Sequence, residues 1–344
     1  MDLAALEQAA AEALDPLAWS YIARGAGDGL TLAENLAAWR RLRLHPHVLH
    51  DVSSIDTATT VLGSPVRAPV LVAPTAMHRF CCEDGEVATA RAAATTGTVM
   101  VVSMAATCSF EDVAAAAPGA SRWAQMYMLR DRARTKALAG RAAAAGYVAI
   151  VASVDGGAVP YGRHVGEGFV PPPQFRFPNL GPPTGAPDLM DMVSEFDTGV
   201  TFDDLACFGN WSGLPVVVKG VLRGDDARRC VDAGAAAIVV SNHGGRTVDG
   251  CVATADALPG VVDAVGGRAE VYVDGGVRNG TDVVKALALG ARAVMVGRPV
   301  LWGLAVGGEK GAAEVLDTLA ADLVRTMAFC GATRVAELTR DLVG

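Results

Sequence analysis

The sequence predicts an α/β fold, a (β/α)8 TIM barrel with an N-terminal helical extension and a long lid-like insertion after the fourth strand. Three observations predict this fold class. Eight short apolar segments are rich in β-forming residues, alanine-rich segments of helical period separate most of them, and nearly every apolar segment ends in polar or glycine residues. A doubly wound open sheet is the alternative, but no GxGxxG motif follows the first strand.

The predicted strands are continuous apolar runs, which is typical of strands buried on both faces of a parallel sheet. They span residues 69–76, 99–103, 123–127, 148–155, 215–220, 236–245, 271–276 and 293–299. Helical segments such as 86–97 and 280–291 lie between them, and we expect Gly290 to stop the second of these helices.

Two regions lie outside this alternation, and we expect the whole chain, 1–344, to form one barrel domain. Residues 1–68 are predicted to form helices and a short hairpin that cover the amino-terminal side of the barrel. Residues 156–200 are rich in glycine and proline, and a long irregular segment of this kind is usually a lid or a disordered stretch. Because this segment follows the fourth strand, we expect it to lie over the mouth of the site.

The composition excludes several classes of protein. Hydrophobic residues make up 51% of the chain and charged residues 19%, which predicts a large folded core. The net charge of -8 argues against a nucleic-acid partner, because a protein that binds nucleic acid needs a basic face. No run reaches the roughly 18 apolar residues of a membrane span, and the amino-terminal segment lacks the basic start of a signal peptide. The seven cysteines show no zinc-like spacing, so we expect reduced thiols, no metal site and a cytoplasmic location.

The ends of the predicted strands carry residues that are poor core-fillers. Barrel enzymes build their active sites at the carboxyl ends of the strands. The residues found there are Pro74, Thr75, Ser103, Gln125, Tyr127, Asp155, Lys219, His243, Asp274, Gly297 and Arg298. Packing alone does not account for such a residue at all eight strand ends, and the pattern therefore predicts an active site.

The last two strand ends, "DGGVRNG" and "GRP", predict an anion site. Gly275 and Gly276 precede a helix start and offer backbone N–H groups, while Arg278 and Arg298 can add charged hydrogen bonds. Taken alone, the two glycines fit a simple tight turn equally well. With "GRP" one strand later, phosphate binding is favoured, because strands seven and eight often carry phosphate sites in barrels.

The segment "SNHGGR", Ser241 to Arg246, predicts acid–base chemistry on a carboxylate. A lone histidine is more often a core residue, but Arg246 can hold a carboxylate while His243 takes a proton. Asp155 can orient that histidine, or simply cap a loop. Lys219 follows a run of valines, so we expect its side chain to be buried next to an anion or an electron-rich ring. The alternative, a lysine that extends from the barrel rim to solvent, is less favoured.

The motifs "LVAPTAM", "QMY", "VVKGV", "SNHGGR", "DGGVRNGTDVVKALALGA" and "VGRP", with the early "SYIARGAGDGLTLAEN", resemble one known family. This is the FMN-dependent L-2-hydroxy acid oxidase and dehydrogenase family, which includes glycolate, lactate and mandelate enzymes. The resemblance runs from about residue 10 to the end of the chain. It implies FMN as the cofactor, which carries the redox chemistry while the protein orients and tunes it.

The resemblance also implies residue roles. His243 is expected to take the substrate's proton and to pair with Asp155. Arg246 and Tyr21 are expected to hold the carboxylate, and Tyr127 is expected to contact the substrate hydroxyl. Lys219 is expected at the N1/O2 edge of the flavin. The other cofactor contacts that the resemblance implies are Pro74, Thr75, Ala76, Ser103, Gln125, Ser153 and Ser241 at the flavin, and Asp274, Gly275, Gly276, Arg278, Gly297 and Arg298 at the ribityl phosphate.

The chain departs from the family pattern in two places near the substrate. After Asp155, the family's usual sequence is replaced by "GGAVPYGRHVG", in which Arg163 is the candidate for the family's second arginine. Ala105 stands where glycolate oxidases carry a bulky aromatic residue. A larger pocket and an altered lid predict a 2-hydroxy acid larger than glycolate, of an aryl or elaborated kind.

We therefore expect FMN-dependent oxidation of an (S)-2-hydroxy acid to the 2-oxo acid, with O2 as acceptor and H2O2 as product. Ala76 matches the oxidase-like form of its turn, and the insertion is proline-rich rather than an apolar membrane-binding helix. The alternatives are a dehydrogenase with another acceptor, a specialised biosynthetic oxidation of an amine or a carrier-attached acid, and a non-catalytic flavin-binding protein. The family resemblance also implies a homo-oligomer, a tetramer.

Overall fold

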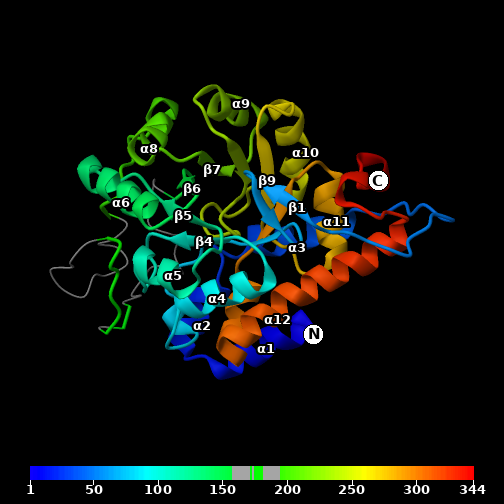
Figure 1. The fold of residues 1–344 in the computed structure, drawn as a ribbon, viewed down its shortest axis with the longest axis horizontal. Coiled ribbons are helices and arrows are strands. Elements are labelled where there is room, and N and C mark those ends of the chain that lie inside the picture. Colours follow the sequence, from blue (N-terminus) through cyan, green and yellow to red (C-terminus); the bar gives the residue numbers. More distant parts are fainter. Residues whose placement is uncertain (157–170, 173, 181–193) are drawn as a thin grey trace.

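The computed structural model describes residues 1–156, 171–172, 174–180 and 194–344, and in this part of the chain eight parallel strands close into a barrel (Figure 1). The predicted TIM barrel is therefore confirmed. Its strands are β3 (Val70–Val72), β4 (Met100–Ser103), β5 (Arg122–Met126), β6 (Ala149–Ser153), β7 (Val216–Val221), β8 (Ala237–Val240), β9 (Glu270–Asp274) and β10 (Ala293–Val296), and β1 (Thr59–Val61) with β2 (Ser64–Val66) forms a separate hairpin. Strand neighbours follow chain order, and β10 pairs with β3 to close the barrel.

Helices surround the barrel (Figure 1). They are α1 (Leu3–Ala13), α2 (Pro16–Ala23), α3 (Leu30–Arg41), α4 (Glu86–Thr96), α5 (Phe110–Ala116), α6 (Arg132–Ala144), α8 (Leu205–Ser212), α9 (Gly224–Asp232), α10 (Thr254–Val265), α11 (Gly280–Ala288) and α12 (Arg298–Cys330), with 3-10 turns η1 (His78–Phe80), η2 (Phe202–Asp204), η3 (Val335–Glu337) and η4 (Arg340–Leu342). Gly290 follows α11 with a φ of 101°, and it ends that helix as predicted. Across the described ranges, no helix is both long and apolar enough to cross a membrane.

The barrel interior is apolar at its amino-terminal end and polar at its carboxyl-terminal end. Trp123 and Tyr272 fill the amino-terminal end, with their ring centroids 5.5 Å apart and no exposed surface. The hairpin buries Val61 and Val66 against this cluster. The hairpin thus closes one end of the barrel, and the polar side chains of the strand ends gather at the other.

The prediction that residues 1–68 cover the amino-terminal side of the barrel is correct only for the hairpin. Helices α2 and α3 reach the carboxyl ends of the strands instead. Asn35 on α3 and Asn242 after β8 exchange two amide hydrogen bonds of 2.8 Å each, and Ala26 N donates to Gly245 O at 2.7 Å. These buried polar groups need polar partners, and the loops at the strand ends provide them. Helix α1 packs along α12 (Figure 1).

Candidate active site

One pocket at the carboxyl ends of the strands brings most of the predicted site residues together. The empty space of this pocket, including the open solvent at its mouth, is about 1330 Å³. The predicted residues that line it are Tyr21, Pro74, Thr75, Ala76, Ser103, Ala105, Gln125, Tyr127, Ser153, Lys219, His243, Arg246, Asp274, Gly275, Gly276, Arg278, Gly297 and Arg298. Asp155 and Ser241 lie behind this wall, and Arg163 lies outside the described residues.

The backbone of "SNHGGR" explains its two glycines. His243, Gly244 and Gly245 all have a positive φ, of 58°, 65° and 75°. The left-handed region is costly for residues with a Cβ, although histidine tolerates it better than most. A Cβ on Gly245 would lie 2.7 Å from Leu32 N. The turn therefore needs glycine after His243, and this turn aims the imidazole into the pocket.

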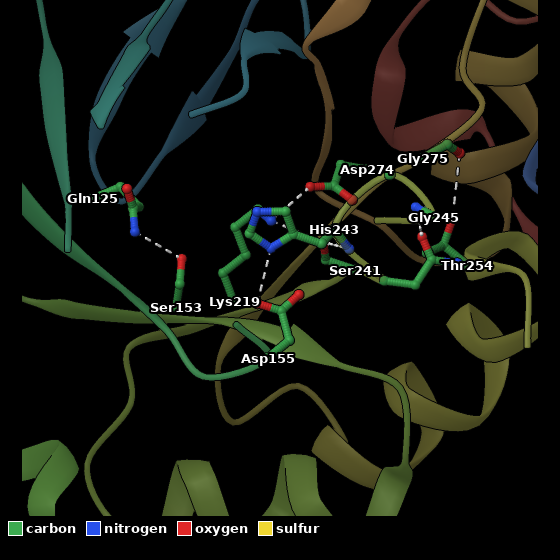
Figure 2. Close-up of polar contacts among 12 residues, drawn as sticks. Gln125, Ser153, Asp155, Lys219, Ser241, His243, Gly245, Thr254, Asp274 and Gly275 are labelled. Atoms are coloured by element: carbon green, nitrogen blue, oxygen red, sulfur yellow. Dashed lines mark hydrogen bonds and ion pairs between the residues drawn. The ribbon is translucent and has the colours of Figure 1, made fainter. Parts of the chain in front are cut away.

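His243 is held by Asp155 (Figure 2). Its Nδ1 lies 3.1 Å from Asp155 Oδ1, and the two side chains are 20% and 9% exposed. Burial raises the pKa of Asp155, but His243 and Lys219 together hold this pKa below its ordinary value. The carboxylate therefore accepts the Nδ1 proton, which leaves the lone pair on Nε2. Nε2 lies on the pocket side, 3.4 Å from the Tyr127 hydroxyl.

The contact between Asp155 and His243 depends on a residue that the sequence reasoning missed. Asp155 follows β6 and His243 follows β8, so their side chains meet across β7. Gly220 in β7 has a φ of 109°, and a Cβ there would lie 2.5 Å from the Cβ of Asp155. The sequence signal is the glycine directly after Lys219 inside an otherwise apolar strand, which often marks a close approach or a bulge.

Lys219 forms a buried ion pair with Asp274 (Figure 2). Lys219 Nζ lies 3.2 Å from Asp274 Oδ2 and donates to Ser241 Oγ at 2.9 Å. Ser241 Oγ also accepts from His243 N at 3.1 Å, so this hydroxyl joins the lysine to the histidine turn. Asp274 Oδ1 is buried and has no hydrogen-bond partner among the described residues, which fits a hydroxyl donor from a bound molecule better than a phosphate.

Three buried polar side chains form a chain across neighbouring strand ends. Ser103 Oγ donates to Gln125 Oε1 at 3.0 Å, and Gln125 Nε2 donates to Ser153 Oγ at 3.1 Å. They come from β4, β5 and β6, which are paired side by side in the barrel. These hydrogen bonds fix which edge of each side chain faces the pocket, and this arrangement suits a flat polar ring.

The opposite side of the pocket is cationic. Arg298 donates to the carbonyl oxygens of Ile22, Gly244 and Arg24, and Arg278 lies 5.0 Å from the ring centroid of Trp302. Within the described ranges, neither guanidinium is ion-paired with a carboxylate. Burial, together with the charges of Arg246 and Arg278, lowers the pKa of Arg298 to about 9. Arg278 and Arg298 are partly buried, and partly buried cations without a carboxylate partner favour a bound anion.

Glycines shape this cationic end. A Cβ on Gly276, whose φ is 83°, would lie 1.9 Å from Asn35 O, so no other residue fits between β9 and α3. Gly297 precedes α12 without a side-chain cap. In the first turn Pro299 has no N–H and Val300 N donates to Gly297 O at 3.0 Å, which leaves the N–H of Arg298 for a ligand. The donors, the charge and the shape of this end therefore fit a phosphate group.

Tyr21 and Arg246 lie together at the pocket mouth. The guanidinium carbon of Arg246 is 4.9 Å from the centroid of the Tyr21 ring, and Arg246 Nη1 donates to Tyr21 O at 2.7 Å. Burial raises the pKa of Tyr21, although Arg246 opposes this, so the phenol keeps its proton. Together they offer a cation and a neutral donor, which can bind one carboxylate.

The described part of the insertion contributes a second feature that sequence reasoning missed. Leu180 and Phe196 line the pocket. Phe196 pairs with Leu129 as an antiparallel bridge, and its ring stacks on Tyr127 with centroids 4.3 Å apart. No motif singles out Phe196, because its contact with Tyr127 exists only once the chain is folded.

The fold and the site define an enzyme class: a barrel enzyme whose pocket fits a phosphorylated cofactor near the ends of β9 and β10 and also contains a histidine paired with a carboxylate. The FMN-dependent dehydrogenase family matches residues 10–344, and the chain belongs to this family. The predicted family, its FMN cofactor and the prediction of an enzyme are therefore confirmed.

Known relatives are similar over nearly their full length. The chain is 46% identical over 345 residues to a protein named L-lactate oxidase from Nostoc sp., covering 96% of this chain and 94% of the relative. It is 44% identical over 352 residues to 2-Hydroxyacid oxidase 1 of Homo sapiens, covering 98% and 94%. A solved structure of mandelate oxidase with (S)-4-hydroxymandelic acid has a TM-score of 0.92 and 37% identity, covering 100% of this chain and 98% of that chain.

The cationic end of the pocket gives the first prediction. Replacing Arg298 with Met removes a charged donor from the phosphate site, and we expect the FMN dissociation constant to rise about 10- to 100-fold. Fluorescence titration of the FMN-free protein with FMN measures this. Arg40→Met, at an exposed position on α3, is the control and should bind FMN like the wild type. If Arg298→Met bound FMN with the affinity of the wild type, the phosphate of FMN would have to lie elsewhere.

Proposed function

We propose that this protein oxidises an (S)-2-hydroxy acid to the corresponding 2-oxo acid, with O2 as the electron acceptor and H2O2 as the second product. One observation carries the proposal. His243, which Asp155 holds from behind the wall, lines the same pocket as Tyr21 and Arg246, so a base and a carboxylate site share this pocket. The 2-hydroxy acid is the simplest substrate that presents a carboxylate next to a carbon bearing a hydroxyl.

The chain's own residues bind the substrate and move one proton. Arg246 and Tyr21 bind the carboxylate and fix the position of the adjacent carbon. His243 Nε2 accepts a proton from the substrate, because Asp155 keeps the other ring nitrogen protonated and stabilises the imidazolium that forms. Tyr127, stacked on Phe196, directs its hydroxyl toward the same nitrogen and hence toward the substrate hydroxyl.

When bound, FMN would supply the acceptor for the two electrons that leave the substrate as a hydride equivalent, and O2 would be the final acceptor. The buried Lys219 supplies a positive charge beside the position that we assign to the flavin, and this charge favours the reduced, anionic ring. Arg278 and Arg298 hold the ribityl phosphate in this proposal, and Ser103, Gln125 and Ser153 face the ring. The use of O2 rests on the relatives, which are named oxidases.

The substrate is larger than glycolate in this proposal. Ala105 is half-buried in the pocket wall and has a small side chain, and Leu180 and Phe196 line the same pocket. Apolar surfaces of this kind favour an apolar substituent on the hydroxy acid. The similarity to mandelate oxidase structures supports an aryl substituent.

The base gives the second prediction. Anaerobic mixing of the FMN-loaded protein with glycolate, (S)-lactate and (S)-mandelate should bleach the flavin, fastest with mandelate. In His243→Ala the rate of bleaching should fall by about 10²- to 10⁴-fold, whereas His50→Ala, on the surface, should behave like the wild type. A wild type that binds FMN yet bleaches with none of these acids would exclude the substrate class. A His243→Ala variant that bleaches at the wild-type rate would exclude the base.

The pocket wall gives the third prediction. Ala105→Trp places a bulky ring in the pocket, so kcat/KM for (S)-mandelate should fall by about 10- to 200-fold relative to kcat/KM for glycolate. Ala105→Ser, which preserves the volume, is the matched control and should keep the wild-type ratio. Steady-state H2O2 production measures both. An unchanged ratio in Ala105→Trp means that the substituent lies elsewhere.

A further inference from the structure

A buried polar cluster behind the pocket has no part in the chemistry described so far. It consists of His78, Glu86 and Thr89, which are 1%, 0% and 0% exposed. Burying a histidine and a carboxylate is costly unless each is fully hydrogen-bonded. The cluster reaches the pocket through Thr75, which follows β3 and lines the pocket.

The turn after β3 brings the His78 ring back onto Thr75. Met77 has a φ of 59°, and this left-handed residue starts the 3-10 turn η1, on which His78 lies. His78 Nε2 is 2.6 Å from Thr75 Oγ1, and His78 Nδ1 is 2.9 Å from Thr89 Oγ1 on α4. The imidazole therefore bridges a helix outside the barrel to a hydroxyl on the pocket wall.

Glu86 fixes this turn in place. Its carboxylate accepts hydrogen bonds from His78 N, from Thr107 N and Oγ1, and from Cys108 N, at 2.7–3.1 Å. Burial raises the pKa of Glu86, but His78 and the donors of Thr107 outweigh burial and hold this pKa below its ordinary value. The ionised carboxylate thus joins the loop after β3 to the loop after β4, and both loops line the pocket.

The hydrogen bonds determine which nitrogen of His78 carries the proton. Burial lowers the pKa of His78, although Glu86 and the Thr75 backbone oppose this, so the ring is neutral at pH 7. Among the described residues, the hydroxyl of Thr89 has His78 Nδ1 as its one hydrogen-bond partner. A buried hydroxyl donates where it can, so Thr89 donates to Nδ1. The ring proton is then on Nε2 and is donated to Thr75 Oγ1.

We propose that His78 is a positioning residue. By donating to Thr75 Oγ1, His78 turns the hydroxyl proton of Thr75 into the pocket, and the Thr75 hydroxyl then donates a hydrogen bond to an acceptor atom of the flavin ring. The proposal rests on the assignment of the FMN ring to this pocket. It gives the order of donors as Thr89 to His78, His78 to Thr75 and Thr75 to the cofactor. A donor to the ring stabilises its reduced, anionic form, so the cluster tunes the cofactor without touching the substrate.

The fourth prediction compares two replacements of His78. His78→Phe preserves a buried ring but removes both hydrogen bonds, and we expect weaker FMN binding by about 3- to 10-fold, a changed visible spectrum and a more negative midpoint potential of the bound FMN. His78→Gln retains an amide donor near the position of Nε2 and should recover most of the wild-type spectrum and potential. If His78→Phe fails to fold, Thr89→Val tests the same order of donors, because it removes the donor to Nδ1 and leaves the pocket intact.

Two further variants separate positioning from packing. Thr75→Val removes the last donor, and combining it with His78→Phe should give no further change in the spectrum or the potential. Thr98→Val removes another buried threonine hydroxyl, which donates to Val70 O at 2.6 Å, and should leave the bound FMN unchanged. The proposal is wrong if folded His78→Phe or Thr89→Val matches the wild type, or if His78→Gln is as altered as His78→Phe. A wild type that does not bind FMN at all would instead refute the cofactor assignment.

Discussion

The hydrogen bond between Asp155 and His243 is the interaction on which the rest of the site depends. It joins the ends of β6 and β8 across the intervening β7, and it forms only because Gly220 has no side chain to separate them. The same turn that aims His243 also places Arg246 beside Tyr21. One contact therefore sets the tautomer of the base and its position relative to the carboxylate site.

The charged groups near this contact differ in whether they have a partner of opposite charge. The cations at the cofactor end have no carboxylate partners in the described part of the chain, whereas Lys219 is balanced by Asp274. A bound phosphate can therefore supply the missing negative charge, whereas Asp274 already supplies one for Lys219. In our proposal the Glu86–His78–Thr75 connection adds a neutral donor, so the pocket would offer the flavin a cationic end, a lysine and an oriented hydroxyl.

The sequence predicted the barrel and most of the site because both follow from local patterns. Apolar runs that end in polar residues predict strand ends, and "SNHGGR" and "DGGVRNG" keep their partners close along the chain. The chain order does not reveal contacts between distant segments, such as Asn35 with Asn242 and Phe196 with Tyr127. For the same reason α2 and α3 were predicted at the amino-terminal end of the barrel, whereas they reach the carboxyl ends of the strands. Asp274 illustrates the difference, because the resemblance implied a phosphate contact and the structure pairs it with Lys219.

The measurement that tests this account most directly is the anaerobic rate of flavin bleaching by (S)-mandelate in Asp155→Asn. The amide keeps the size of the side chain but no longer holds the proton on His243 Nδ1, so the lone pair on Nε2 is lost from part of the molecules. We expect the limiting rate to fall about 100-fold or more, while FMN binding and the mandelate dissociation constant stay close to those of the wild type. A folded, FMN-loaded Asp155→Asn protein that bleaches at the wild-type rate would contradict the central role of this pair.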